Sequence, residues 1–340
     1  MNAWVASHDN QVRCSVVIPT YNRAIWLPGC VASVRAGGIE GLEIVVVDDG
    51  STDDTRAVVA ALGPDVRYLH QPNGGISAAC NRGIEAARGR FLGILGSDDR
   101  WLPDAPGRLL TFLERHPEVG AGFGDANYGN ARDGYQSWIE VMGGRTFREV
   151  ACRSIEGDLR VLDRAAFFRR LVGRRQPVFV GATLVRRQAL DQVGQFNLAL
   201  QEGEDWELWM RLAAYYPFAF FAQPVAVYER HADNLSNDAD LMQRMFVNAL
   251  RSVLALPLPL NAAERALVRS RLREETFAWA YAAYDRGEMA SARARLARPR
   301  AGEESGLREL LYWSATWLGG SNVRRLRRLK RRIEGSGAPA

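Results

Sequence analysis

The stretch FLGILGSDDRWLP, from Phe91 to Pro103, has the composition of a buried strand that ends in acid. Its apolar run, 91–95, stops at Gly96-Ser97 and is followed by the adjacent carboxylates Asp98 and Asp99. In an open α/β sheet, ligands bind at the carboxyl ends of the strands, and paired carboxylates there can hold a divalent metal on a phosphate-bearing substrate. Gly, Ser and Asp also favour ordinary turns. The stretch alone leaves both interpretations open, a turn and a metal site.

Strand-like and helical segments alternate on both sides of this stretch. Before it, the sequence predicts strands at 14–18 (ended by Pro19), 43–47 and 66–70, and helices at 24–36, 52–62 (with Thr52 as N-cap) and 76–87. After it, helices are predicted at 104–115, 162–171, 187–193 and 204–215, and strands at 119–123, 178–185, 218–221 and 225–228. The rest of 124–175 gives no clear pattern, and from 238 onward the pattern is helical, at 241–254, 262–286, 289–296 and 307–317. This alternation indicates an α/β fold with a mostly parallel sheet covered by helices on both faces.

Polar residues also follow the first two predicted strands. PTYNR, 19–23, ends the first strand, and DDGS, 48–51, ends the second. Parallel strands place both groups at the same edge as Asp98 and Asp99, and this clustering favours a binding site over turn chemistry. No GxGxxG follows the first strand, and the single lysine, Lys330, is remote, which excludes a GxxxxGK phosphate loop and counts against a receiver domain. The remaining class is an α/β nucleotide binder that neutralises phosphate with metal and arginine.

The positive charge of the chain is concentrated near its C-terminus. The net charge is +5, but seven basic residues and one acid lie between Val323 and Glu334, so the remainder, with 37 basic and 38 acidic residues, is close to neutral. A helix over RRLRRLKRR would be basic with a narrow apolar strip, which suits anionic lipid headgroups. Nucleic-acid binding is not expected, because no aromatic and basic face accompanies the run. A solvated or disordered tail is the common alternative.

The chain lacks the usual signals for export or membrane insertion. Its first residues, MNAWVASHDNQVR, contain no positive region followed by an apolar one, and no window reaches 18 uninterrupted apolar residues. Its four cysteines are scattered, which is typical of buried thiols in a reducing compartment. We therefore expect a cytoplasmic protein, with peripheral attachment to the inner face of the membrane through 323–333 as an option.

Four runs of sequence together resemble the inverting glycosyltransferases of family 2, which have the GT-A fold. They are VVIPTYNR, EIVVVDDGSTDDT, NGGISAACNRGIEAARGRFLGILGSDD and GEDWELWMRLA, in this order within 14–231. The resemblance implies a GT-A catalytic domain over 12–235, a nucleotide-diphospho-sugar transferase with a Rossmann-like sheet. Its nucleotide-sugar-binding half would be 12–123 and its acceptor-binding, base-carrying half 124–235. A C-terminal helical region, 236–322, and a basic tail, 323–340, would follow.

The resemblance also assigns the donor site, residue by residue. For the nucleotide it implies Pro19, Thr20, Tyr21, Arg23, Asp49, Asn73, Ser77, Asn81, Arg82 and Asp98. The helix predicted to begin near Ile76 would offer N-terminal amides to phosphate. For a divalent metal, Mn or Mg, the resemblance implies Asp99 as principal ligand, with Asp98 and His231. The family motif usually has a further Asp where this chain has Gly96. One carboxylate that usually contributes to metal affinity is therefore missing.

The second half must supply a base, because an inverting transferase removes a proton from the acceptor hydroxyl. By resemblance, Asp205 in GEDW is the base and Glu204 supports it. A carboxylate in the first helical turn is expected to stay ionised next to the helix dipole. Trp138, Trp206 and Trp209 could stack on sugar faces, and core packing is the alternative.

The implied function is transfer of a sugar, of hexosyltransferase type, from a nucleotide-diphospho-sugar to a hydroxyl of a glycan or lipid-linked acceptor, as in polysaccharide biosynthesis. The expected donor is a UDP-sugar, and the expected mechanism is metal-assisted direct displacement. Two other functions stay open. One is a non-catalytic nucleotide-sugar-binding scaffold, which Gly96 motivates, and the other is a membrane-surface adaptor that acts through the basic tail.

Overall fold

The computed structural model describes residues 12–144, 147, 149–173, 176–200, 203–231, 238–296 and 314. The basic tail predicted at 323–340 and nearly all of the helix predicted at 307–317 lie outside these residues. Among the described helices, none combines the length and the apolar character that a membrane span requires.

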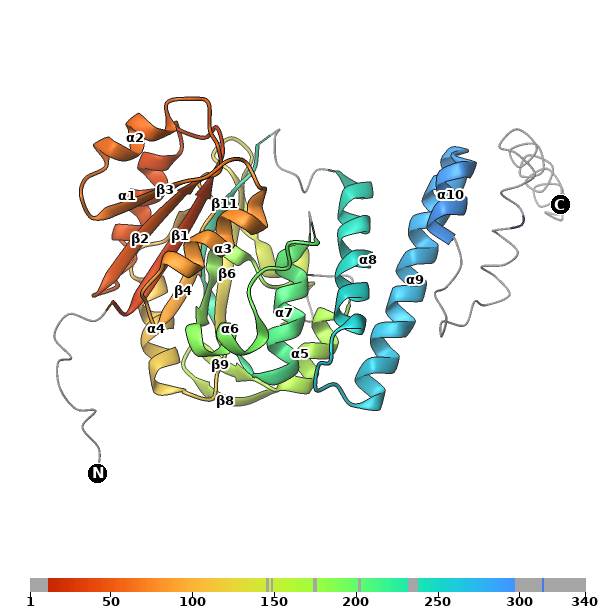
Figure 1. Ribbon diagram of the computed structural model, residues 1–340. Helices are drawn as coiled ribbons and strands as arrows, with labels where there is room; N and C mark the ends of the chain where they lie inside the picture. The colour runs from red at the N-terminus through yellow and green to blue at the C-terminus, as the bar shows by residue number, and fades with distance from the viewer. Residues whose placement is uncertain are drawn as a thin grey trace, which may run out of the picture.

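One mixed sheet forms the centre of the molecule, with the strand order β3-β2-β1-β4-β10-β6-β11-β9-β8 (Figure 1). The first four strands along this path are mutually parallel: β3 (Val66–His70), β2 (Leu42–Asp48), β1 (Cys14–Thr20) and β4 (Phe91–Ile94). β10 (Thr183–Arg186) is antiparallel to β4 and to β6 (Ala121–Asn130), and β11 (Phe218–Glu229) returns parallel to β6. β9 (Leu159–Leu162) and β8 (Cys152–Glu156) complete the far edge, and the short strands β5 (Arg100–Trp101) and β7 (Gly134–Ser137) pair with β11 and β6.

Helices cover both faces of the parallel part, as the alternation predicted. Val16 and Ile18 of β1 share a core with α1 (Leu27–Arg35) and α2 (Thr55–Ala61), whereas Val17 faces α3 (Ile76–Ala86) on the opposite side. α3 approaches the sheet closely at Gly83, where a Cβ would lie 2.2 Å from a Val17 methyl group. The second half is covered by α4 (Ala105–Arg115), α5 (Arg164–Leu171), α6 (Arg187–Val193) and α7 (Glu204–Tyr215).

Three local predictions are wrong, each for a physical reason. β1 continues through Pro19, because β4 ends beside Val17 and Pro19 pairs only with β2, so its missing N–H leaves no gap in the ladder. Residues 218–221 and 225–228 are one strand, β11, interrupted by a register shift around Pro224. Thr52 does not cap α2, which begins at Thr55, because the Thr52 N–H donates to Asn22. The part of 124–175 without a predicted pattern contains the end of β6, then β7, the π-helical turn η1 (Ile139–Gly143), β8 and β9, and the helix predicted at 162–171 is confirmed as α5.

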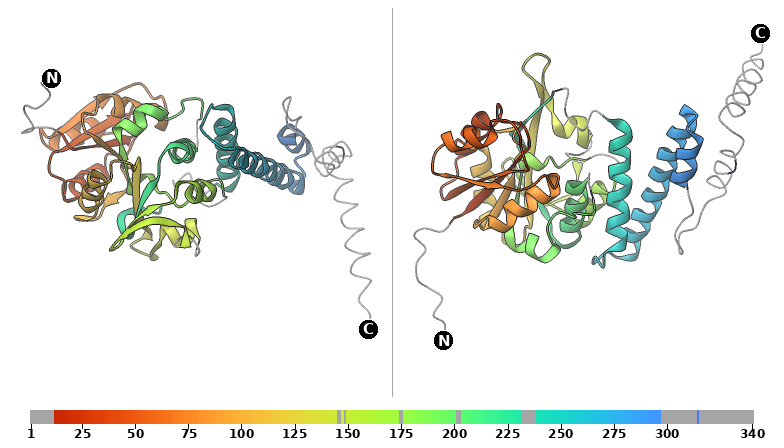
Figure 2. Two further views of the ribbon diagram at one scale, coloured as in Figure 1. Left: turned by 90° about the horizontal axis from the view of Figure 1, so that it is seen from below. Right: turned by 45° about the horizontal axis from the view of Figure 1, so that its top comes forward.

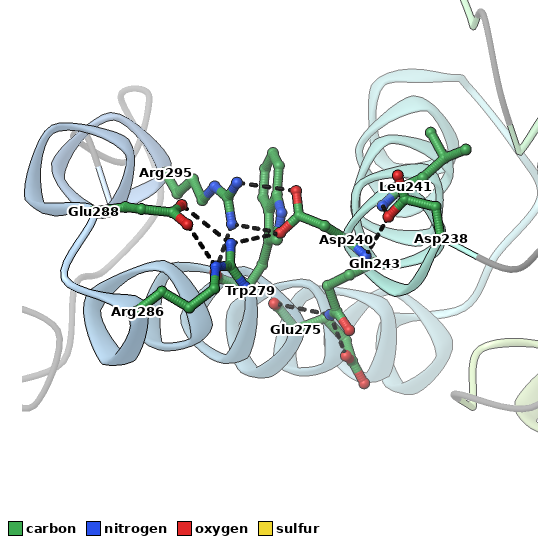
Figure 3. A network of polar contacts seen from close by, with 9 residues as sticks. All are labelled: Asp238, Asp240, Leu241, Gln243, Glu275, Trp279, Arg286, Glu288 and Arg295. Carbon is green, nitrogen blue, oxygen red and sulfur yellow. Dashed lines mark hydrogen bonds and ion pairs between the residues drawn. The ribbon is translucent and has the colours of Figure 1, made fainter.

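The C-terminal helices project from the second half of the sheet (Figures 1 and 2). They are α8 (Ala239–Ala255), α9 (Ala262–Arg286) and α10 (Met289–Leu296). Figure 3 shows how they are joined: Asp240 of α8 accepts hydrogen bonds from Arg286 of α9 and Arg295 of α10, and the Arg295 guanidinium lies 4.4 Å from the Trp279 ring centroid. The three helices therefore form one unit that is held by ion pairs as well as apolar contact.

α8 attaches this unit to α7. The Phe246 and Trp206 rings stack with centroids 4.0 Å apart, and the Ser252 hydroxyl donates to Glu207, which is fully buried and paired with Arg211. Gly203, which precedes α7, has φ +76° and lies against the Met245 backbone of α8. The start of α7 is thus fixed from the C-terminal side.

Replacing Gly203 with Ala is expected to lower the free energy of unfolding by about 2 kcal/mol or more. The added side chain would be strained at φ +76°, and its Cβ would lie 2.9 Å from the Met245 carbonyl oxygen. Gly134→Ala is the control, because Gly134 has φ +83° and nothing within 4 Å of an added Cβ. Urea unfolding of both variants measures the difference, and equal losses would show that contact with α8 adds nothing.

Candidate active site

The loops that follow β1 and β2 interlock at the carboxyl edge of the sheet. Asn22, at φ 52°, donates its backbone N–H to the Ser51 hydroxyl (2.9 Å) and accepts from the Thr52 N–H (2.7 Å) through its side-chain oxygen. Asp53 accepts from the Ala24 N–H at 3.0 Å and also bonds Thr55, so it organises the loops instead of lying free in solvent. The two loops therefore behave as one platform, from which Tyr21 projects with 48% of its surface exposed.

Asp49 fixes the loop that leads into α3. Its Oδ1 accepts from the Gln71 side chain (2.7 Å) and the Gly74 N–H (2.9 Å), and its Oδ2 accepts from the Gly75 N–H (2.8 Å). The neighbouring Asp48 accepts from the Ser51 N–H and the Tyr68 hydroxyl, and these bonds lower its pKa although burial opposes the shift. Both carboxylates thus hold the loops in place through hydrogen bonds.

Two buried hydroxyl groups at this edge lack a partner among the described residues. They are Thr20 Oγ1, at the end of β1, and Ser77 Oγ, in the first turn of α3, in side chains that are 3% and 6% exposed. Buried hydroxyls are normally hydrogen-bonded. Their position beside the exposed amides of a helix N-terminus suits a phosphate or ribose group.

The remaining residues assigned to the nucleotide lie nearby in different environments. Asn73 and Arg82 are exposed, and Pro19 is buried within β1. Asn81 is buried, and its amide pairs with both the N–H and the carbonyl of Phe196, at 3.0 and 2.9 Å. Asn81 therefore ties α3 to the second half of the chain, and its contact with a nucleotide stays a prediction.

Arg23, Asp98 and His231 form a chain of contacts. Asp98 Oδ2 accepts from the Arg23 guanidinium and lies 2.8 Å from His231 Nε2. The Trp26 ring stacks on the imidazole with centroids 5.8 Å apart, and 39% of Trp26 is exposed. The structure thus brings three of the predicted site residues together, although their positions in the sequence are far apart.

Asp99 is the buried member of the acidic pair, with 7% exposure. Its Oδ1 accepts from the Glu229 N–H at 3.3 Å, and burial first, then the charge of Asp98, raise its pKa well above the usual value. An ideal Cβ on Gly96 would lie 2.7 Å from an Asp99 oxygen and 3.0 Å from an Asp98 oxygen. The two carboxylates therefore converge over Gly96, in the space that a side chain there would fill.

This pair fits a divalent cation as a donor set of two hard oxygens, with the His231 nitrogen beside Asp98. A cation would offset the repulsion that raises the pKa of Asp99. Within the described residues, however, no group of three His, Cys, Asp or Glu side chains has the arrangement of a complete metal site.

Asp205 lies half-buried at the start of α7. Its Oδ1 accepts from the Trp206 N–H at 2.6 Å, and its Oδ2 accepts from the Gln176 side-chain amide at 3.2 Å. Burial raises the pKa of Asp205 to about 6. Desolvation therefore outweighs the hydrogen bonds that favour the charged form of Asp205. The carboxylate is still mainly ionised at neutral pH, with a basicity suited to accepting a proton.

The donor-side loop and the start of α7 meet at α3. The buried Cys80 thiol of α3 has a raised pKa, first because of burial and then because of the charges of Glu204, Asp205 and Asp49. The charges of all three carboxylates therefore act on one thiol of α3. The predicted acidic residues of both halves converge around one helix.

The tryptophans proposed as sugar platforms are packing residues. Trp206 and Trp209 are only 5% and 1% exposed, and Trp138 packs among Tyr128, Phe179 and Tyr228. The alternative of core packing is thus confirmed for these residues.

Three residues of the site escaped the sequence interpretation: Asn22, Trp26 and Gln176. Asn22 could have been recognised, because Asn tolerates positive φ and follows a strand end. Trp26 lies next to the PTYNR run but carries no motif of its own. Gln176 is 29 positions from Asp205, in a segment without regular structure, so no local pattern links them.

Comparison with known proteins agrees with this geometry. The model of the family described as glycosyl transferase family 2 matches residues 15–175. The chain therefore resembles glycosyl transferase family 2 over just under half of its length. Hyaluronan synthase of Pasteurella multocida is 42% identical over 103 residues, which are 29% of this chain and 11% of the synthase. An uncharacterised glycosyltransferase of Rickettsia felis is 39% identical over 111 residues, 32% of this chain and 18% of that protein. The chain therefore aligns with less than a fifth of the length of either relative.

Solved structures share the fold of this chain. S. aureus TarS 1–349 in complex with UDP-GlcNAc superposes with a TM-score of 0.57 at 16% identity, covering 89% of this chain and 79% of TarS. The mannosyltransferase PcManGT of Pyrobaculum calidifontis, in complex with GDP-Man and Mn²⁺, gives 0.55 at 18% identity, covering 90% and 79%. The chain has the GT-A-like α/β fold with C-terminal helices.

Replacing Asp49 with Asn should speed hydrogen exchange at the Gly74 and Gly75 amides by about tenfold or more, because hydrogen bonds to a charged acceptor are stronger than those to an amide. The reason is that the carboxylate accepts from both N–H groups. Asp65→Asn is the control, since Asp65 is an exposed carboxylate paired with Arg35. Unchanged protection at both glycines in the Asp49 variant would contradict the role of Asp49 in this loop.

Proposed function

We propose that the protein is an inverting glycosyltransferase that moves a sugar from a nucleotide-diphospho-sugar to a hydroxyl of a glycan or lipid-linked acceptor. The observation that carries this proposal is the cluster at the carboxyl edge of the sheet, where Arg23 and His231 meet Asp98 beside the buried Asp99. The match of residues 15–175 to glycosyl transferase family 2 supports the reaction class.

The proposed donor is a UDP-sugar. Support comes from the unpartnered hydroxyls of Thr20 and Ser77 and from the N-terminal amides of α3, which together match a ribose and diphosphate. TarS has been solved with UDP-GlcNAc and PcManGT with GDP-Man, so the fold accommodates nucleotides of both kinds. Tyr21, Asn73 and Arg82, which are exposed at this edge, are the proposed contacts for the outer part of the donor.

Asp205 is the proposed base. It takes the proton of the acceptor hydroxyl, the freed oxygen bonds to the anomeric carbon, and the bond from that carbon to the diphosphate breaks with inversion. Arg23 and the α3 amides stabilise the negative charge on the departing diphosphate. Mn or Mg held by Asp98 and Asp99, with His231 beside them, would supply further charge neutralisation there. Glu204, adjacent to the base, supports it.

A non-catalytic nucleotide-sugar-binding scaffold is the second candidate, favoured by Gly96 and by the lack of a three-ligand metal cluster among the described residues. It predicts UDP binding without turnover. We further propose peripheral attachment to an anionic membrane surface through 323–333, supported by the charge of that segment alone.

Asp205→Asn should abolish transfer while donor binding remains. The loss of turnover is expected to be at least about 100-fold, because general base catalysis typically contributes that much. Wild-type turnover should fall as the pH drops through about 6, since protonated Asp205 accepts no proton. Released nucleoside diphosphate from UDP-sugars and GDP-mannose with Mn²⁺ measures turnover, and calorimetry with UDP measures binding. Exposed Asp191→Asn is the control, and full activity in the Asp205 variant would overturn the base assignment.

Mn²⁺ in the presence of UDP should raise the thermal unfolding midpoint of the wild type but not of Asp99→Asn. A ligand at roughly 100 times its Kd adds about 2.7 kcal/mol of stability. The buried Asp99 carboxylate gains most from a cation, because its pKa is raised by burial and by Asp98. Asp205→Asn should keep the full Mn²⁺ shift. An equal shift in the Asp99 variant would place the metal elsewhere.

A further inference from the structure

Gln176 lies between α5 and β10, on a segment that the core holds in place. Pro177 follows it and restricts its backbone, and the next two residues, Val178 and Phe179, are buried at 0% and 4% exposure. The Gln176 side chain is itself half-buried and reaches the N-terminal end of α7. A side chain anchored in this way can hold a neighbour in a defined position.

The orientation of the Gln176 amide follows from its partner. Nε2 donates to Asp205 Oδ2 at 3.2 Å. An ionised carboxylate can only accept, so the nitrogen must face Asp205 and the amide oxygen must point elsewhere. That oxygen, Oε1, is buried and has no hydrogen-bond partner among the described residues. A buried carbonyl oxygen without a protein donor is suited to accept a hydrogen bond from a ligand.

We infer that Gln176 is a positioning and specificity-determining residue, whose N–H holds Asp205 and whose Oε1 accepts a hydrogen bond from a second hydroxyl of the acceptor sugar. The inference rests on the proposed transfer reaction and names the acceptor chemistry, a sugar with a hydroxyl on the carbon next to the reacting one. One amide then fixes both the base and the hydroxyl that the base deprotonates. An acceptor without this second hydroxyl would leave Oε1 without a hydrogen-bond donor.

Gln176 is a neutral hydrogen-bond partner of Asp205, whereas the titratable groups nearby can carry negative charge. Glu204 precedes it on the same helix, and Cys80 of α3, with a pKa raised by burial and by these carboxylates, faces it from the neighbouring element. The bonds from Gln176 and from the Trp206 N–H both favour the ionised form, against the larger effect of burial. Removing the Gln176 amide must therefore raise the pKa of Asp205 further.

Two substitutions separate the two roles. Gln176→Met removes both hydrogen bonds at similar volume, whereas Gln176→Glu keeps an accepting oxygen and replaces the N–H donor with a negative charge. Gln223→Met is the matched control, because the Gln223 amide of β11 also donates to a carboxylate at 3.2 Å, that of Asp158 in the turn between β8 and β9, but on the exposed surface. The control should behave as wild type in every assay.

The first measurement needs no turnover. Carbon-13 NMR of protein labelled at Asp carboxyls gives the titration midpoint of Asp205, whose signal is identified by its loss in Asp205→Asn. Loss of one hydrogen bond should raise the midpoint by about half a pH unit or more in Gln176→Met, and further in Gln176→Glu, where a second carboxylate lies alongside. A midpoint in both variants equal to the wild-type value would overturn the positioning role.

The second measurement follows turnover of UDP-GlcNAc and GDP-mannose with Mn²⁺, using methyl glycosides and their monodeoxy analogues as acceptors. The wild type should discriminate against one deoxy analogue by about tenfold or more. Gln176→Met should lose that preference, whereas Gln176→Glu should keep it. In Gln176→Met, the pH below which turnover falls should rise together with the NMR midpoint of Asp205. Unchanged discrimination in Gln176→Met would overturn the specificity role and leave the transferase intact. A shifted NMR midpoint without turnover in any form would support the positioning role and refute the proposed function.

Discussion

The carboxylate of Asp49 is the fixed point of the site, because three N–H donors from residues 71–75 converge on it. Those bonds determine where α3 begins, and α3 contacts both halves of the chain. Gly83 of α3 lies against β1, and Asn81 is hydrogen-bonded to the Phe196 backbone. The pKa of Cys80 is raised by burial and by the charges of Glu204 and Asp205. A shift of the Asp49 loop would therefore move the proposed donor site and change its distance to Asp205, the proposed base.

Burial of charge is the energetic cost of this arrangement. Asp99 and Asp205 both have raised pKa values, with desolvation as the largest cause in each. A carboxyl group whose pKa is raised on folding makes the fold less stable as the pH rises through its folded value, so ionised Asp205 works against folding at neutral pH. The fold offsets the cost with a large core and with the ion-paired C-terminal helices, and α8 holds the start of α7 through the Phe246–Trp206 stack. Stability is thus supplied away from the groups that do the chemistry.

The sequence was informative where a signal was local and periodic. Strands β1 to β4, helices α3, α6, α7, α9 and α10, and the acidic strand end at Asp98 and Asp99 all follow from apolar periodicity and turn residues. Pairings across long sequence distances were hidden. Arg23 meets Asp98, His231 reaches the same oxygen, and Gln176 meets Asp205 only because tertiary packing brings together segments that are far apart in the sequence. The raised pKa of Asp205 could not be predicted for the same reason, since the packing that buries it comes from distant segments and not from its own helix.

Gly96 acquires a physical meaning from the same packing. Asp98 and Asp99 each direct one oxygen into the space above it, so an Asp at this position would have to displace both carboxylates or leave the strand end. Glycine at position 96 therefore permits the side-chain conformations of Asp98 and Asp99, in addition to removing one possible metal ligand. Arg23 and His231 already share one oxygen of Asp98, which leaves the buried Asp99 as the carboxylate with the least neutralisation. The charge balance of the pair thus favours binding a cation and a diphosphate together over binding either one alone, because the cation relieves Asp99 while the anion meets Arg23 and the amides of α3.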